Sequence, residues 1–234
     1  MVLIQKLLAI AQVAGGVVLY LLLGLSVLSI GMIIERWWFF RRRRVDVDQL
    51  GREVLRRLDE DDRAGVTSLL VASRSVEAEV LGAAMKWYEA GPDSFQEVLT
   101  GAMRQARKKL EGGLLFLGTL GNNAPFIGLF GTVLGIVTAF RELGAGAGAT
   151  SGAMGNVMSA IAEALVATAV GILVALPAVI AYNTFQKKAT QIEDNVGTLG
   201  SLVAAQMKAT DGRKNHTTSK RERELRAVGP EAEA

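Results

Sequence analysis

The stretch VMSAIAEALVATAVGILVALPAVIAYNTFQ, residues 157–186, decides the fold, because its 30 positions carry a single charge, Glu163. A membrane-spanning helix needs about 20 mainly apolar residues, and this stretch supplies them. Two further runs have the same character: residues 7–34 hold 28 uncharged positions in succession, and residues 112–140 hold 29. The pattern predicts an all-α integral membrane protein with three transmembrane helices.

Basic clusters flank these runs and predict how the chain crosses the membrane. Positively charged flanks face the cytoplasm. The first run is followed by Arg36 and Arg41–Arg44. The second is preceded by Lys108 and Lys109, and the third is followed by Lys187 and Lys188. A cleaved signal peptide would have a shorter apolar run with its basic residues in front, so we interpret the first run as a span.

The runs and their flanks predict the order of domains. An N-terminal transmembrane helix (1–35), entered from the periplasm, leads to a cytoplasmic helical domain (36–111), which feeds a second transmembrane helix (112–140). A periplasmic hairpin (141–156), assigned from its Gly, Ala and Ser content, leads to the third transmembrane helix (157–186). A cytoplasmic helical extension (187–207) and a polar tail expected to be disordered (208–234) follow.

The cytoplasmic segments carry signals of packed helices. Asp46 or Asp48 can cap a helix over about 49–60, and Ser94 with Glu97 fits a capping box that opens a helix leading to the second span. In the extension, apolar residues recur every three or four positions and predict a packing seam; they are Ile192, Val196, Leu199, Val203 and Met207.

The composition excludes several classes of protein. The 234 residues contain no Cys and one His, His216, and the net charge is only +3. Disulfide frameworks, thiolate or imidazole metal sites, and Cys- or His-based catalytic centres are therefore excluded, and we expect no metal and no cofactor. The spans lack the Asp pair of an intramembrane protease, so we expect no enzyme. The small net charge gives no reason to expect a nucleic-acid partner.

Small residues recur along one face of the second and third spans. The second span carries Gly118, Gly121, Pro125, Gly128, Thr132 and Gly135, with Gly131 beside them, and the third carries Ala160, Ala164, Thr168, Gly171 and Ala175. In lipid, such stripes let helix backbones approach closely. Two interpretations stay open: the two spans pack together within one subunit, or the stripes also assemble a homo-oligomer.

Glu163 is the one ionisable residue well inside a span. A charge at the centre of a membrane helix costs roughly 2.5–3.5 kcal/mol on insertion scales, and no Lys or Arg within the spans could pair with it. We therefore expect a role in ion or proton passage, facing a polar cavity or a partner. The alternative is a solvated residue at the mouth, because Glu163 lies within about two turns of the outer end of its helix.

Thr132 and Thr168 carry hydroxyls that suit a water-lined path, although a threonine in a membrane helix often bonds only its own backbone. Thr168 lies five residues after Glu163, about 140° around an ideal helix. It is therefore predicted to face the second span or an adjacent subunit. Pro125 and Pro177 lie inside the spans, where they either free backbone carbonyls for water or neighbouring groups or simply kink the helix.

Two long motifs are specific enough to carry a family resemblance. Residues 124–133 read APFIGLFGTV, and residues 161–171 read IAEALVATAVG and continue through Pro177 to Tyr182-Asn183. Together with the three-span layout, they resemble the ExbB/TolQ/MotA family of inner-membrane proton-channel subunits, its ExbB/TolQ branch in particular. The resemblance extends over about residues 10–207, and the tail lies outside it.

The resemblance implies a homopentamer around two copies of a single-span, ExbD/TolR-like partner that carries an Asp in its own span. On the matching positions, Glu163 would line the pore, and Thr132 and Thr168 would lie on the proton path near that Asp. Helix packing or kinking would fall to Pro125, Gly128, Gly131, Gly135, Gly171 and Pro177.

The implied function is that of a stator-type molecular motor in the cell inner membrane, in contact with membrane lipid. It would use proton-motive force, through the partner, to do work on periplasmic or outer-membrane machinery. Protein transport, envelope maintenance, secretion and gliding motility all use family members. The alternative is a secondary transporter or passive channel, or a membrane scaffold, that acts without such a partner.

Overall fold

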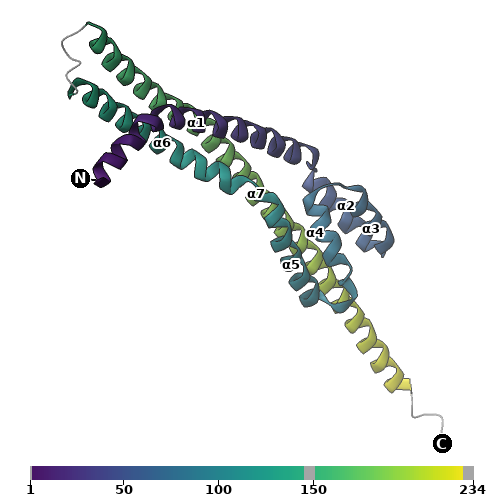
Figure 1. The fold of residues 1–234 in the computed structure, drawn as a ribbon. Helices are drawn as coiled ribbons and strands as arrows, with labels where there is room; N and C mark the ends of the chain where they lie inside the picture. Colours follow the sequence, from purple (N-terminus) through teal and green to yellow (C-terminus); the bar gives the residue numbers. More distant parts are fainter. Residues whose placement is uncertain (1, 145–150, 229–234) are drawn as a thin grey trace, which may run out of the picture. The chain divides into compact units, whose positions relative to one another are not determined.

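A computed structural model describes residues 2–144 and 151–228, and every element in these two stretches is helical (Figure 1). The predicted all-α class is confirmed. The three long helices are α1 (Val2–Arg42), α6 (Leu114–Gly144) and α7 (Ser151–Val228). Shorter elements lie between α1 and α6: α2 (Val47–Asp59), α3 (Arg63–Ala72), α4 (Val76–Met85), the 3-10 turn η1 (Tyr88–Ala90) and α5 (Pro92–Leu110).

Three of the described helical segments are long and apolar enough to cross a membrane. They lie within Gly16–Asp59, Leu114–Arg141 and Val157–Thr210, and their most apolar windows have mean hydropathies of 2.6, 1.6 and 2.5. Large apolar side chains stay exposed on each of them, among them Leu28 and Leu173. Because such exposure is unfavourable in water, these faces suit lipid or another apolar protein surface.

The chain divides into two compact units. The first comprises the residues up to Phe39 together with Glu111–Lys187 and holds the apolar parts of α1, α6 and α7. The second comprises Phe40–Leu110 and the residues from Lys188 onward. All residues singled out above for proton passage fall in the first unit, whereas most of the predicted cytoplasmic helical domain (36–111) and the seam fall in the second.

The core of the second unit is built on the predicted seam. Val196, Leu199, Val203 and Met207 are all buried. A Cβ added at Gly51 of α2 would lie 3.0 Å from a methyl carbon of Leu199, so α2 and the later part of α7 pack closely there. The seam is therefore an intrachain contact. Around it, α2 packs on α3, α3 on α4, and α4 on α5.

Side-chain caps fix where the short helices begin. The Asp46 carboxylate accepts a hydrogen bond from the Gln49 backbone N–H at 2.9 Å, so Asp46, not Asp48, caps α2. The capping box expected at Ser94 is wrong, because α5 already begins at Pro92. Gly91, with φ of +96°, turns the chain immediately before it. Proline suits the first helical position since its missing N–H would be unpaired there anyway.

Two predicted boundaries differ from the structure. α6 continues to Gly144 and α7 begins at Ser151, so only residues 145–150 of the expected hairpin remain between them, and these lie outside the described residues. α7 is helical through Val228, although the tail is expected to be disordered from residue 208. Residues 208–228 contain no proline and are rich in Lys, Arg, Glu and Ala, which are strong helix formers. Residues 229–234 lie outside the described residues.

Candidate functional site

Two hydroxyl groups join the second and third apolar helices. Thr132 of α6 and Thr168 of α7 are half-buried and hydrogen-bonded to each other through their Oγ1 atoms. The Thr132 Oγ1 also lies 3.2 Å from the Ala164 carbonyl oxygen of α7 and 3.3 Å from the Gly128 carbonyl oxygen of its own helix. Thr168 therefore faces the second span. Thr132 combines the backbone bonding common among membrane threonines with contacts across the two helices.

Glycines allow the backbones to come close enough for this hydroxyl pair. A Cβ on Gly128 would lie 2.7 Å from the Ala167 carbonyl oxygen, and a Cβ on Gly171 would lie 2.6 Å from the Ala124 carbonyl oxygen. Real Cβ atoms essentially never approach within 3.0 Å of another heavy atom. Any larger residue at either position would separate α6 from α7 where Thr132 meets Thr168.

The two remaining glycines of the predicted set extend the same contact. A Cβ on Gly135 would clash with the Ala164 Cβ, and a Cβ on Gly131 would lie 3.0 Å from both the Ala167 Cβ and a methyl of Val18 in α1. All four glycines thus lie at helix contacts within a single chain. Pro125 is half-buried inside α6 and Pro177 is exposed inside α7, and neither ends its helix.

The Glu163 side chain lies on an exposed face of α7. Within the part of the chain that the structure describes, it forms no hydrogen bond or ion pair. α1 passes beside it, since a Cβ on Gly16 would lie 4.0 Å from its Oε1. Ser159, one turn earlier, is also exposed, whereas Ala167, one turn later, is buried. The structure thus sets Glu163 and the hydroxyl pair on different faces of α7, linked through the adjacent residue, Ala164.

This arrangement can bind and pass protons. An ionised carboxylate in hydrocarbon is costly, and contact with water, a cation or a proton relieves that cost. A threonine hydroxyl both donates and accepts, so a pair of them can take part in a hydrogen-bonded chain. Sequence reasoning missed the contribution of α1, because Gly16 and Val18 give no signal of proximity beyond the presence of a small residue.

Among the side chains that the structure places, no three His, Asp or Glu residues gather as a possible metal site. The site is built instead from one carboxylate, two hydroxyls and the backbone carbonyls that the glycines bring within reach.

The model of the MotA/TolQ/ExbB proton channel family matches residues 72–197, just over half of the chain. The chain belongs to this family. The matched range includes Thr132, Glu163 and Thr168 and ends in the cytoplasmic extension expected from the sequence.

Individual relatives agree with this assignment. Over 105 residues the chain is 46% identical to the Tol-Pal system protein TolQ of Pseudomonas aeruginosa, a match that covers 43% of this chain and 44% of that protein. It is 31% identical over 195 residues to the putative biopolymer transport protein ExbB-like 1 of Synechocystis, covering 80% and 74%. A third relative, the biopolymer transport protein ExbB of Xanthomonas campestris, is 44% identical over 98 residues, covering 40% and 38%. The chain thus spans less than half the length of the TolQ and ExbB relatives.

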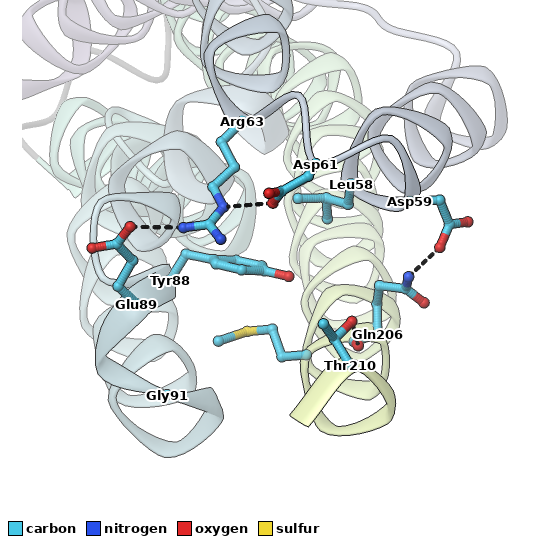
Figure 2. Close-up of a pocket in the computed structure, with 10 residues that line it drawn as sticks. Leu58, Asp59, Asp61, Arg63, Tyr88, Glu89, Gly91, Gln206 and Thr210 are labelled. Atoms are coloured by element: carbon cyan, nitrogen blue, oxygen red, sulfur yellow. Dashed lines mark hydrogen bonds and ion pairs between the residues drawn. The ribbon is translucent and has the colours of Figure 1, made fainter. Parts of the chain in front are cut away.

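The second unit of this family member holds a separate polar pocket of about 480 Å³ (Figure 2). The Arg63 guanidinium lies between the carboxylates of Asp61 and Glu89, at 3.2 Å and 2.7 Å, and stacks over the Tyr88 ring. The Gln206 amide of α7 bonds Asp59 across the pocket. These groups satisfy one another, so we regard the pocket as a structural link between neighbouring turns and α7, and it contains none of the residues expected on the proton path.

Proposed function

We propose that this chain is the proton-channel subunit of an inner-membrane motor, with no enzymatic activity of its own. The observation that carries the proposal is an exposed Glu163 carboxylate on an apolar helix whose next residue, Ala164, presents its carbonyl to the Thr132–Thr168 hydroxyl pair. Protons would pass between the exposed face that carries Glu163 and the α6–α7 contact that carries the hydroxyl pair. Family membership supports the proposal, since the family is one of proton channels.

The energy source would be the membrane potential and the proton gradient. Moving one elementary charge through 100 mV supplies about 2.3 kcal/mol. A few protons therefore supply enough free energy for a conformational step between two protein components. Work would reach periplasmic or outer-membrane machinery through a partner, as the relatives' names, which refer to the Tol-Pal system and to biopolymer transport, suggest.

The partner would be a single-span, ExbD/TolR-like protein with an Asp in its span, and two copies would sit inside a pentamer of this chain. Two observations support an assembly. The spans of this chain contain no Asp, so a second titratable group must come from elsewhere if a carboxylate relay is used. Large apolar side chains also remain exposed on α1, α6 and α7, among them Tyr20, Phe126 and Leu165.

The mass of the assembly tests this proposal. The detergent-purified chain, alone and co-expressed with its candidate partner, is weighed by native mass spectrometry. We expect about five times 24.9 kDa for the chain alone and the addition of two partner copies on co-expression. A monomer or dimer that binds no partner would contradict the motor and favour a self-contained transporter, a passive channel or a scaffold.

A further inference from the structure

The second unit contains a groove of about 960 Å³ with strongly basic walls. We call it the basic groove and define it by Arg42, Arg43, Arg74 and Lys86, the basic side chains that line it. The only acidic residue among its lining residues is Glu79. The Glu79 carboxylate is already matched, at 2.8 Å by Lys109 and at 3.6 Å by Arg43. The groove therefore presents a net positive charge.

Two of the four basic side chains are available to a ligand. Arg74 and Lys86 are exposed and form no hydrogen bond or ion pair with any residue that the structure describes. They flank α4, Arg74 just before its first turn and Lys86 just after its last residue. The groove therefore has one available cation near each end of α4, whose ten residues rise about 15 Å.

Hydroxyl and apolar groups complete the lining. The Ser73 and Ser75 hydroxyls lie 3.2 Å apart, and Ser75 also caps α4 through the Ala78 N–H. Leu70 and Val71 of α3 add an apolar wall, and Val71 is 79% exposed. The combination of cations, hydroxyls and exposed aliphatic carbon fits a ligand with an anionic head and an adjoining apolar part.

Arg42, one of the basic residues that line the groove, lies close in sequence to the first span. Arg42 ends α1, the helix that carries the first span, and lies eight residues beyond Ile34, the last residue of the uncharged run. At 1.5 Å per residue this is about 12 Å along the helix axis. Trp37 and Trp38, both about half exposed, come between them, and tryptophans favour the level of the lipid headgroups.

We propose that the basic groove binds the headgroup of an anionic phospholipid in the leaflet at which the first span ends. The lipid phosphate pairs with Arg74, the hydroxyls of the headgroup meet Ser73, Lys86 adds to the positive potential of the groove, and an acyl chain leaves past Val71. Basic residues directly next to a membrane helix favour anionic lipid, and the groove gives this general attraction a defined place.

The experiment counts bound lipid on the full chain. The protein in a neutral detergent is titrated separately with phosphatidylglycerol, phosphatidylcholine and inorganic phosphate, and the bound molecules are counted by native mass spectrometry. We expect phosphatidylglycerol to bind in clear preference to phosphatidylcholine. Equal binding of the two lipids would overturn the proposal, and so would inorganic phosphate that displaces phosphatidylglycerol at equal concentration, since the site would then be one for free phosphate.

A pair of double variants locates the site. Each basic residue near an anionic surface changes affinity about fivefold, so Arg74→Gln with Lys86→Gln should weaken phosphatidylglycerol binding roughly 25-fold. The matched control, Arg104→Gln with Lys208→Gln, removes the same charge from exposed positions of α5 and α7 outside the groove. It should leave binding unchanged. An equal loss in both pairs would assign the effect to net charge and overturn the groove, and circular dichroism checks that all variants keep their helix content.

Discussion

Glu163 has neighbours that isolate its carboxylate instead of neutralising it. α1 approaches it with Gly16, which has no side chain to offer, and the next turn of α7 presents Ala167 to α6. Among the side chains that the structure describes, this carboxylate has no partner, so water, a proton or another subunit can take that place. A structural role would need a fixed partner within the described chain, and none is found there.

The substitution Glu163→Gln tests that role directly. Glutamine keeps the size of the side chain and its ability to form hydrogen bonds, but its amide does not gain or lose a proton as a carboxylic acid does. We expect unchanged assembly and at least a tenfold lower proton flux, measured with a pH-sensitive dye in proteoliposomes that contain the chain and its partner under an imposed potential. Ser159→Ala, one turn earlier on the same exposed face, is the control. Undiminished flux in the glutamine variant would remove Glu163 from the path.

The hydroxyl pair gives a second prediction at this scale. Thr132→Val keeps the shape of the side chain and removes the hydroxyl, so the hydrogen bond with Thr168 is lost, and we expect reduced proton flux. Thr132→Ser should restore most of it. Thr138→Val is the matched control on the same helix, because the Thr138 hydroxyl bonds the Leu134 carbonyl oxygen of its own helix, at 3.0 Å, and no other group that the structure describes. Equal losses in Thr132→Val and Thr138→Val would indicate a structural effect.

The direction of individual side chains was only partly predictable. The 140° offset from Glu163 indicates correctly that Thr168 faces the second span, since angular position on a helix follows from residue count alone. The contact of Thr132 with the Ala164 carbonyl could not be predicted, because it depends on how α6 crosses α7. Likewise, the sequence gives no signal that Gly16 lies beside Glu163.

Within the helices, the glycines of α6 and α7 are not equivalent to those of α1. A Cβ at Gly171 meets the Ala124 carbonyl oxygen at 2.6 Å, whereas a Cβ at Gly24 or Gly31 of α1 has nothing within 4 Å. Chemically identical substitutions therefore have different consequences according to the helix that carries them.

Gly171→Ala should destabilise the α6–α7 pair by about 1–3 kcal/mol, the usual cost of overpacking. The loss would be measured as a lower thermal unfolding temperature of the purified chain in detergent. Gly24→Ala provides the control, since alanine favours a helix over glycine and meets no neighbour there, so its unfolding temperature should stay the same or rise. A Gly171→Ala protein as stable as the Gly24→Ala protein would contradict the close contact.

A feature of a helix could be predicted where the residues that cause it lie close together in the sequence. The cap of α2 and the buried seam of α7 follow from residues within a few turns of one another, and both were predicted, although the choice between Asp46 and Asp48 was not. The start of α5 was misplaced by three residues, because Pro92 competes with the Ser94 capping box as a start signal. The helical tail was missed because charged composition alone does not separate a solvated helix from a disordered chain.

At the scale of the whole molecule, the orientation of the chain in the membrane is predicted from its charged flanks. It can be measured by labelling single introduced cysteines, because the chain contains no Cys of its own. We expect a membrane-impermeant maleimide to label Gly144→Cys in intact cells, since Gly144 ends α6 on the side that the charged flanks predict to be periplasmic. Gln105→Cys, exposed on α5, should react only after the membrane is permeabilised. The reverse pattern would invert the topology.

The number of spans and the family were accessible from the sequence, since uncharged runs and long motifs are properties of the chain itself. The sequence could not show which contact the small-residue stripes make, because the same spacing suits a contact within one subunit and a contact between subunits. The structure brings Gly128, Gly131, Gly135 and Gly171 to contacts within one chain. Any contact between copies must therefore use other faces, where large apolar side chains are exposed.

The closure of α6 on α7 also bears on biogenesis. A newly inserted chain can complete this pairing by itself, at any dilution, because both surfaces travel on the same polypeptide and are joined by a short connection. If the chain assembles as proposed, each copy would bring its α6–α7 pair already formed, and only the joining of copies and partner would depend on how much protein the membrane holds.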